Sequence, residues 1–156
     1  MMKYLIIALL ATSITHADTR VIENSVGYSH DLFEDMHPIQ GYTKHVTVTE
    51  NSHLFISGHI DSQHRGLYGT ADEAIMVAFK VKVNGRWLKG STTGGNIVGT
   101  KQRYYSAQIH GYKYLETGDY VISVYGRSAS TAAPGFGGLA EIKASMNHVI
   151  YKIVTD

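Results

Sequence analysis

The sequence predicts an all-β protein: one antiparallel β-sandwich, of the jelly-roll type, after a cleaved signal peptide. Short segments of alternating apolar and polar residues recur over residues 42–154, and turn residues separate them. The 16 glycines and 11 tyrosines suit turns and half-buried strands, and no convincing helical stretch occurs. Residues 120–127 are expected near the middle of a sheet, because both faces of this strand have large side chains.

The first 17 residues have the features of a secretory signal peptide. Lys3 gives a basic start, residues 4–11 are apolar, and Thr15-His16-Ala17 offers small residues at the peptidase positions. The apolar run is too short to cross a bilayer, which needs about 20 residues. We therefore expect a mature chain that begins at Asp18, is secreted or periplasmic, and has no transmembrane segment.

The composition excludes several classes of function. The mature chain has 13 basic and 13 acidic side chains, and this balance argues against a nucleic-acid partner. The sequence has no cysteine, which excludes thiolate catalysis and Cys-bound zinc. It has no G-x-S-x-G motif either, so a binding protein is favoured over an enzyme, although the sequence leaves that question open.

The chain divides into an N-terminal extension and a sandwich domain. In the extension, residues 18–41, a short edge strand is expected at 20–23, and the rest is a loop on the outside of the sandwich, where Pro38 prevents a long helix. The domain covers residues 42–156. Its strands are predicted at residues 42–49, 54–60, 75–83, 86–89, 104–109, 112–115, 120–127, 139–144 and 149–154.

Turn and loop signals separate these strands. Asn84-Gly85 predicts a hairpin with a type I′ turn, and Gly111 predicts a bulge. Loops are expected at residues 61–73, 91–100 and 128–138. The last strand is expected in the middle of a sheet, because it is too apolar for an exposed edge. The side chains predicted to face the core are Leu54, Ile56, Val77, Phe79, Val81, Leu115, Ile122, Val124, Ile142 and Val149.

The order of these elements resembles the jelly-roll sandwiches of the C1q and tumour-necrosis-factor type, including bacterial and phage-tail relatives. The similar stretches are VTVTENSHLFISGHI, IMVAFKVKVNGRWL, LETGDYVISVYGRS and HVIYKIV. They extend over residues 42–154 and leave residues 18–41 unexplained. The resemblance implies a protein that binds a ligand or receptor, often as a trimer, and it assigns no functional residue.

Aromatic residues are the first candidates for a binding site. Tyrosine and tryptophan dominate recognition surfaces, and their flat faces stack on sugar rings. A secreted, non-enzymatic module that binds glycans or another surface ligand is therefore the leading hypothesis. The alternative is a set of tyrosines that cap the core with their hydroxyls in water. The candidate ligand-binding residues are Trp87, Tyr104, Tyr105, Tyr112 and Tyr114, together with Arg65 and Tyr68 from the loop at 61–73.

The same loop region is the candidate for a metal site. Asp61, Asp72 and Glu73 offer oxygen ligands for calcium, and His59 and His64 could join Asp61 around a transition metal. Their spacing matches no ligand signature, so a solvated polar loop is the competing interpretation. A secreted hydrolase that uses this loop is the rival function, and a structural subunit of a surface assembly is a third.

A homo-oligomer, and in particular a trimer, is expected from the last strands. Residues 121–125 and 149–154 have apolar or aromatic groups on both faces, whereas one domain buries only one face of each strand. The other face needs a cover, because large exposed apolar patches are uncommon on monomers. Tyr125 and Tyr151 are predicted near the contact.

Overall fold

The computed structural model describes residues 19–25, 30–64, 74–98, 104–130, 140–142 and 148–156, which form two antiparallel β-sheets. The strands of the first sheet, sheet A, are β1 (Thr19–Ser25), β2 (His30–Asp31), β4 (Ser52–His64), β8 (Tyr104–Leu115), β10 (Ala140–Ile142) and β11 (His148–Thr155). The strands of the second, sheet B, are β3 (His37–Val48), β5 (Ala74–Val83), β6 (Arg86–Trp87), β7 (Thr93–Val98) and β9 (Gly118–Ser130).

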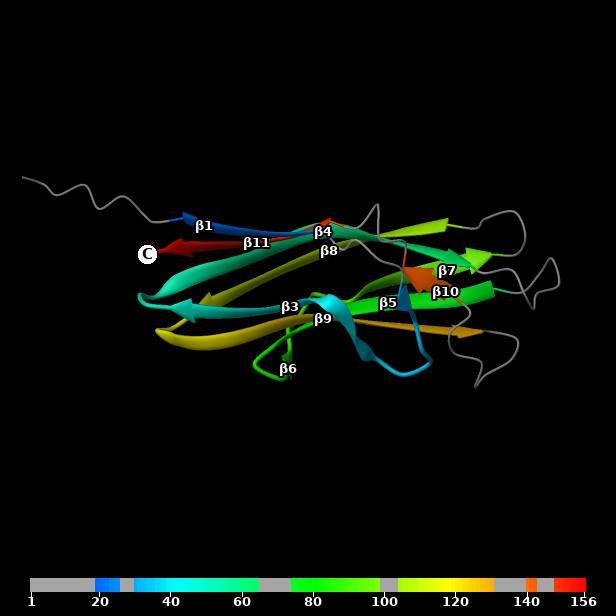
Figure 1. Cartoon of the computed structure of the whole chain (residues 1–156), viewed down its shortest axis with the longest axis horizontal. Helices are drawn as coiled ribbons and strands as arrows, with labels where there is room; N and C mark the ends of the chain where they lie inside the picture. The colour runs from blue at the N-terminus through cyan, green and yellow to red at the C-terminus, as the bar shows by residue number, and fades with distance from the viewer. Residues whose placement is uncertain (1–18, 26–29, 65–73, 99–103, 131–139, 143–147) are drawn as a thin grey trace, which may run out of the picture.

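The two sheets pack face to face as a β-sandwich (Figure 1). Sheet A has the strand order β1-β11-β4-β10-β2, and β8 pairs with the opposite edge of β4. Sheet B has the order β3-β9-β5-β6, and β7 pairs with β5 ahead of β6. Sequence-adjacent strands β3 and β4, β4 and β5, and β8 and β9 lie in different sheets. The predicted antiparallel sandwich is therefore confirmed.

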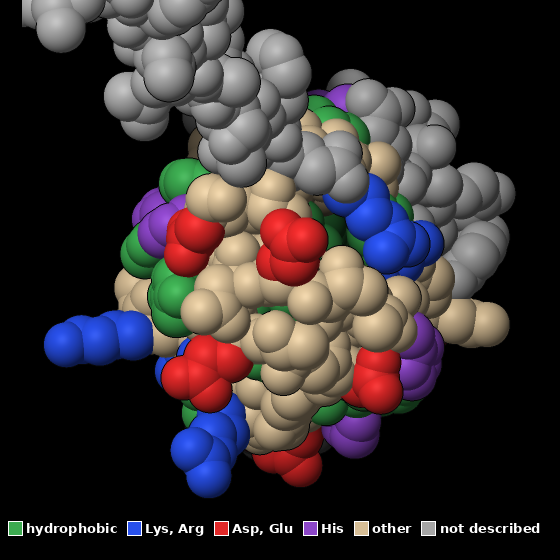
Figure 2. Space-filling model, turned by 90° about the vertical axis from the view of Figure 1, so that its left-hand side faces the viewer, with side chains coloured by type: hydrophobic (Ala, Val, Ile, Leu, Met, Phe, Trp, Pro, Cys, Tyr) green, Lys and Arg blue, Asp and Glu red, His purple; other side chains and the backbone are tan. Residues whose placement is uncertain are grey.

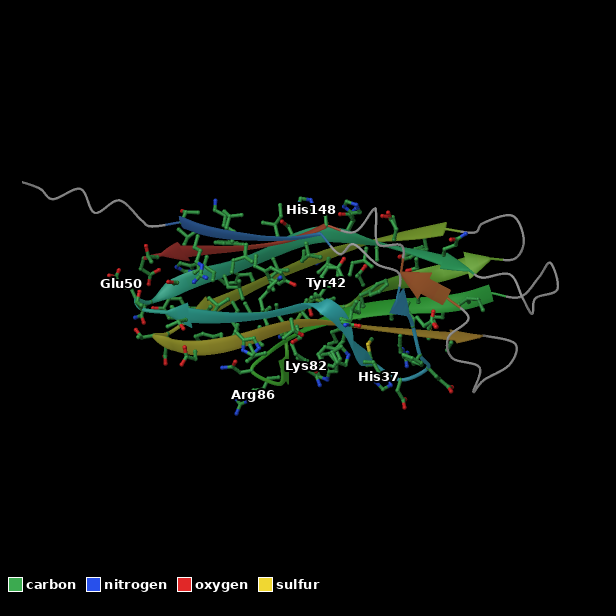
Figure 3. The ribbon with its side chains drawn as sticks, in the orientation of Figure 1. His37, Tyr42, Glu50, Lys82, Arg86 and His148 are labelled. Atoms are coloured by element: carbon green, nitrogen blue, oxygen red, sulfur yellow. The ribbon has the colours of Figure 1, made fainter. Side chains whose placement is uncertain are left out.

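The core lies between the sheets, where the apolar face of each strand meets its counterpart. Alternation with period two puts every second side chain on this inner face. In Figure 3 the Tyr42 side chain lies between the two layers, and it is fully buried. Of the side chains predicted to face the core, Ile142 lies outside the described side chains, and the others are all buried: Leu54, Ile56, Val77, Phe79, Val81, Leu115, Ile122, Val124 and Val149.

The segment before residue 42 differs from the predicted outer loop. It contributes β2 and the first part of β3, and Leu32 and Ile39 are buried in the core. Ser128 on β9 fixes this segment, since its amide donates to the Phe33 carbonyl at 2.7 Å and its hydroxyl to the Leu32 carbonyl at 2.9 Å. Such contacts join residues distant in sequence, so local periodicity could not predict them. The predicted edge strand at 20–23 is confirmed as part of β1.

The predicted outlines of four other segments were wrong. The expected loop at 91–100 contains β7, and β4 runs three residues beyond Asp61, to His64. The expected strand 86–89 pairs only at Arg86 and Trp87. The pairing of β8 with β4 has no register shift at Gly111, so there is no bulge. A Cβ atom at this position would lie 2.5 Å from the Leu88 side chain, so Leu88 would have to shift to accommodate it.

The last strand lies inside sheet A, between β1 and β4, as predicted. Tyr151, however, is not on an outer contact surface: it is fully buried and donates a hydrogen bond to the Tyr42 carbonyl at 3.1 Å. Tyr151 has the same parity as Val149, and side chains two apart on a strand share a face. A contact between copies of the chain through Tyr151 is therefore contradicted.

Candidate binding groove

A groove of about 770 Å³ opens at one edge of the sandwich, between the end of β8 and the hairpin of β5 and β6. Along the first part of β5, from Ala74 to Phe79, this edge is closed, because β7 pairs with β5 there and also packs near β8. Beyond Phe79 only the two residues of β6 pair with β5, so the edge opens. The groove is lined by Val83, Asn84, Arg86, Trp87, Leu88, Lys89, Tyr112, Lys113, Tyr114, Glu116 and Tyr120.

The Asn84-Gly85 turn fixes one wall of the groove. Both residues have positive φ angles, 48° and 74°, as the predicted type I′ turn requires. The Asn84 side chain accepts a hydrogen bond from the Val121 amide at 2.7 Å and donates one to the Asp119 carbonyl at 3.1 Å. These contacts hold the hairpin to β9, so the next residues, Arg86 and Trp87, project from a firmly held turn.

Leu88 forms the floor of the groove. Its side chain is buried, and its amide donates to the Val81 carbonyl at 2.8 Å. The Ser91 hydroxyl accepts from the Val81 amide at 3.1 Å and donates to the Leu88 carbonyl at 2.8 Å. These bonds satisfy the backbone amide and carbonyl of Val81, at the edge of β5 that β6 no longer covers. A short strand pairing and one buried leucine therefore create the opening and define its depth.

Trp87 stands between the groove and the outer face of sheet B. Its side chain is 42% exposed and meets the ring of Tyr125 edge-on, with centroids 5.2 Å apart. The ammonium groups of Lys80 and Lys82 lie 4.9 and 4.3 Å from the indole centroid, in cation–π contact. Lys82 and Arg86 lie on the outer side of sheet B (Figure 3).

Tyr112 and Tyr114 line the groove from the end of β8, and their rings lie on the outer face of sheet A beside His53 and Phe55. The ring of Tyr112 stacks on His53 with an interplanar angle of 20°, and its hydroxyl is 2.7 Å from His53 Nδ1. His53 Nε2 is 2.7 Å from Asp156 Oδ1, and the Tyr114 hydroxyl donates to Asp156 Oδ2 at 3.2 Å. Desolvation, the hydrogen bond to Asp156 and the nearby carboxylates raise the pKa of Tyr114. Both tyrosines are therefore held by one His-Asp pair.

The charges around the groove are unequal. Arg86, Lys89 and Lys113 line it and are exposed, whereas Glu116 is the one carboxylate among its lining residues. In Figure 2, which shows the end of the sandwich near Glu50, acidic side chains lie over the end itself, and basic side chains project at the left and at the upper right. The groove is therefore aromatic and basic, although the whole chain has a formal charge of only +1.

The structure brings together three of the predicted ligand residues, Trp87, Tyr112 and Tyr114. Tyr105 is elsewhere, half-buried and packed against the core, and its ring fills the space that a Cβ atom on Gly95 would need. Tyr104 begins β8, but its side chain is outside the description. Arg65 and Tyr68 lie outside the described residues.

The predicted metal site remains a prediction. His59, Asp61 and His64 belong to β4, and Asp72 and Glu73 lie outside the described residues. Within the described part of the chain, no three His, Asp or Glu side chains are grouped closely enough to hold a metal ion. Asp61 is buried in a strand, not exposed in a loop. Calcium binding and a hydrolase centred on residues 59–73 are therefore untested.

Sequence reasoning missed the charged residues of the groove and the pair that holds its β8 tyrosines. A local signal existed for the cations, because Arg86 and Lys89 flank the tryptophan hairpin and Lys113 separates two tyrosines. No such signal existed for His53 and Asp156, which are far apart in sequence and meet only through the pairing of β4, β8 and β11.

The fold and groove define a class of protein: a two-sheet antiparallel β-sandwich with an aromatic site at its open edge. No protein-family model matches the chain. No curated protein matches it. No described residues form a helix long and apolar enough to cross a membrane.

Solved structures of the tumour-necrosis-factor class match most of the chain, as the resemblance predicted, at low identity. Murine APRIL is 15% identical, with a TM-score of 0.48 over 86% of this chain and 98% of that one. Eiger TNF from S. frugiperda is 12% identical, with a TM-score of 0.41 over 87% and 85%. A chain of the T13 IBDV viral particle is 8% identical, with a TM-score of 0.49 over 89% and 36%.

Proposed function

We propose that the chain is a non-enzymatic module that binds a carbohydrate in the edge groove. The observation on which this depends is that Trp87, Tyr112 and Tyr114, from two different sheets, all line one opening of about 770 Å³. Flat aromatic faces bind the apolar faces of sugar rings, and charged side chains beside them bind the polar groups. A groove of this volume accommodates a short oligosaccharide.

The distribution of acidic groups supports binding without hydrolysis. Glycoside hydrolysis ordinarily uses two carboxyl groups about 5 to 9.5 Å apart on either side of the scissile bond. Glu116 is the one carboxylate among the residues that line the groove, and Tyr114 shares the hydrogen bonds of Asp156 with His53. One carboxylate among the lining residues is fewer than the two that such hydrolysis uses, which supports binding without hydrolysis.

Export of the mature chain, to the periplasm or outside the cell, is part of the proposal, because a surface glycan must be reached there. The signal-like residues 1–17 support it. Mass spectrometry of the exported protein should then find an N-terminus at or next to Asp18. An exported protein that keeps Met1 contradicts this part of the proposal.

Self-association, with a trimer as the expected form, also belongs to the proposal. With Tyr151 in the core, the outer face of sheet A is the better candidate for the contact. Val21, Phe55 and Tyr112 are exposed and lie in one row across β1, β11, β4 and β8, in which Lys152 of β11 stands between Val21 and Phe55. Exposed apolar rows of this kind are typical of interfaces.

Calorimetric titration of the mature protein with a panel of polysaccharides tests the function. We expect binding to at least one polysaccharide, weakened at least tenfold by Trp87→Ala or Tyr112→Ala because each removes an aromatic ring that borders the opening. Phe33→Ala is the matched control, since Phe33 is also an exposed aromatic side chain but does not line the groove. The proposal fails if no polysaccharide binds, or if the three variants bind alike.

A further inference from the structure

The surface around Trp87 contains more positive charge than a neutral sugar would use. We infer that the ligand is an anionic polysaccharide, whose chain leaves the groove over Trp87 and continues along the outer face of sheet B. Lys80 and Lys82 bind its acidic groups there, while Arg86, Lys89 and Lys113 bind those inside the groove. This inference rests on the proposed carbohydrate function and specifies the class of ligand and a second subsite.

The lysine pair on sheet B is the first observation. Lys80 and Lys82 are two apart on β5, so their side chains share the outer face. Both ammonium groups contact the same indole, at 4.9 and 4.3 Å, and Lys82 is also 4.4 Å from the Tyr125 ring centroid. Two like charges held on one ring repel each other. An anionic group between them would relieve this repulsion and receive hydrogen bonds from both.

The lysine subsite is continuous with the groove. Trp87 lines the groove, and it is also paired directly with Lys82 across β5 and β6. Arg86 lies one position further along the hairpin, opposite Val83, and lines the groove too. A chain that stacks on Trp87 therefore meets cationic groups on both sides of it. A short ligand would reach only one of these two sets.

The cations are not neutralised by carboxylates of the protein. In the part of the chain that the structure describes, none of the side chains of Lys80, Lys82, Arg86, Lys89 and Lys113 is joined to a carboxylate by an ion pair. The mature chain as a whole has balanced charge. Positive charge is therefore concentrated around Trp87, and this local field favours an anionic ligand without making the whole protein a general polyanion binder.

Carboxylated and sulfated polysaccharides share the required chemistry, so both serve as probes. We would titrate the mature protein with polygalacturonate, dextran sulfate and unmodified dextran of matched length, at about 0.05 M and about 0.5 M NaCl. Wild type should bind at least one anionic polymer about tenfold more tightly than dextran at the lower salt concentration, and this preference should shrink at the higher one. Comparison of the two anionic polymers identifies which acidic group the site prefers.

Variants distinguish the lysine subsite from the groove. Lys82→Gln should weaken the anionic polymer about threefold, and Lys80→Gln combined with Lys82→Gln about tenfold, because each lost charge removes one exposed ionic contact. Lys82→Arg should bind the anionic polymer as tightly as wild type, since it keeps the positive charge over the indole. The control is Lys152→Gln, which makes the same charge change at an exposed site on sheet A.

The outcomes separate the two proposals. Equal binding of dextran and the anionic polymers would overturn the anionic ligand while leaving the carbohydrate function intact. So would a Lys82→Gln variant that binds like Lys152→Gln. Tighter binding of a single-stranded DNA oligonucleotide than of any polysaccharide would overturn it as well. If no polysaccharide binds, both proposals fall together.

Discussion

Leu88→Ala tests whether the groove is built by the packing described above. The Leu88 side chain is only 7% exposed and occupies the space that a Cβ atom on Gly111 would need. Leu→Ala changes in cores cost about 2 to 5 kcal/mol, depending on how far the surroundings collapse. Leu88 lies at the floor of an open groove, where water can fill the space that its side chain leaves, so we expect about 2 to 3 kcal/mol.

Urea unfolding measures this loss. For a domain of this size the slope is about 2 kcal/mol per molar urea, so the midpoint should fall by about 1 to 1.5 M. Circular dichroism follows the whole sandwich, and the fluorescence of Trp87, the single tryptophan, follows the hairpin beside Leu88. Leu88→Ala should also weaken polysaccharide binding, because the floor of the groove is lost.

Leu54→Ala is the matched control for this prediction. Leu54 is fully buried between the sheets and does not line the groove, so its loss should cost more stability, about 4 kcal/mol. The folded Leu54→Ala protein should bind polysaccharide normally. A stability loss below about 0.5 kcal/mol for Leu88→Ala, or weaker binding in both variants, would refute the assignment of Leu88 as the floor of the groove.

Three further predictions concern the sheets and their outer face. Gly58→Ala should lower the free energy of unfolding in urea by more than about 3 kcal/mol, because its Cβ atom would overlap the His148 carbonyl across β4 and β11. Gly85→Ala is the control: it has open space around it and should cost only about 1 kcal/mol through its positive φ. Similar losses for both variants would contradict the pairing of β4 with β11. Burial and the nearby Tyr42 raise the pKa of Tyr151 well above its ordinary value, so above about pH 10 the unfolded state releases this proton first and stability falls with rising pH. Tyr151→Phe should lose about 1 kcal/mol at neutral pH, because the hydrogen bond to Tyr42 is lost, and should flatten the alkaline slope of stability by about 1.4 kcal/mol per pH unit. An unchanged slope would show that the Tyr151 hydroxyl is not protected in the folded state. If light scattering finds an oligomer at tens of micromolar, Phe55→Glu should dissociate it, because the change places a carboxylate in an apolar contact. Phe33→Glu, at an exposed aromatic residue outside that contact, should leave the oligomer intact. An oligomer that survives Phe55→Glu would exclude the outer face of sheet A as the contact.

The strands that sequence reasoning predicted well were those with a strong local signal. Residues 75–83 alternate clearly, and Asn84-Gly85 forms the predicted turn because few other dipeptides adopt positive φ twice. The apolar strand at 149–154 was harder, because both of its faces are apolar and alternation alone cannot choose between them. The structure resolves this through Tyr151, whose hydroxyl finds a partner in the core.

The candidate site was predictable in residue type but not in position. Trp87, Tyr112 and Tyr114 could be named because tyrosine and tryptophan dominate recognition surfaces. That they meet depends on how far β7 and β6 extend along β5, which leaves one edge of the sandwich open. Pairing of this kind is set by residues far apart in sequence. For the same reason, the support of Tyr112 by His53 and Asp156 could not be foreseen.

The most direct test of carbohydrate binding in the groove is the emission of Trp87 during titration with the polysaccharide that binds most tightly. Trp87 is the only tryptophan and lines the groove, so a sugar ring stacked on it must change its environment. The emission should shift and saturate at the same polysaccharide concentration as the calorimetric signal, and Tyr112→Ala should move both curves together. Saturable binding that leaves the Trp87 emission unchanged would contradict the proposal, because the ligand would then occupy another surface.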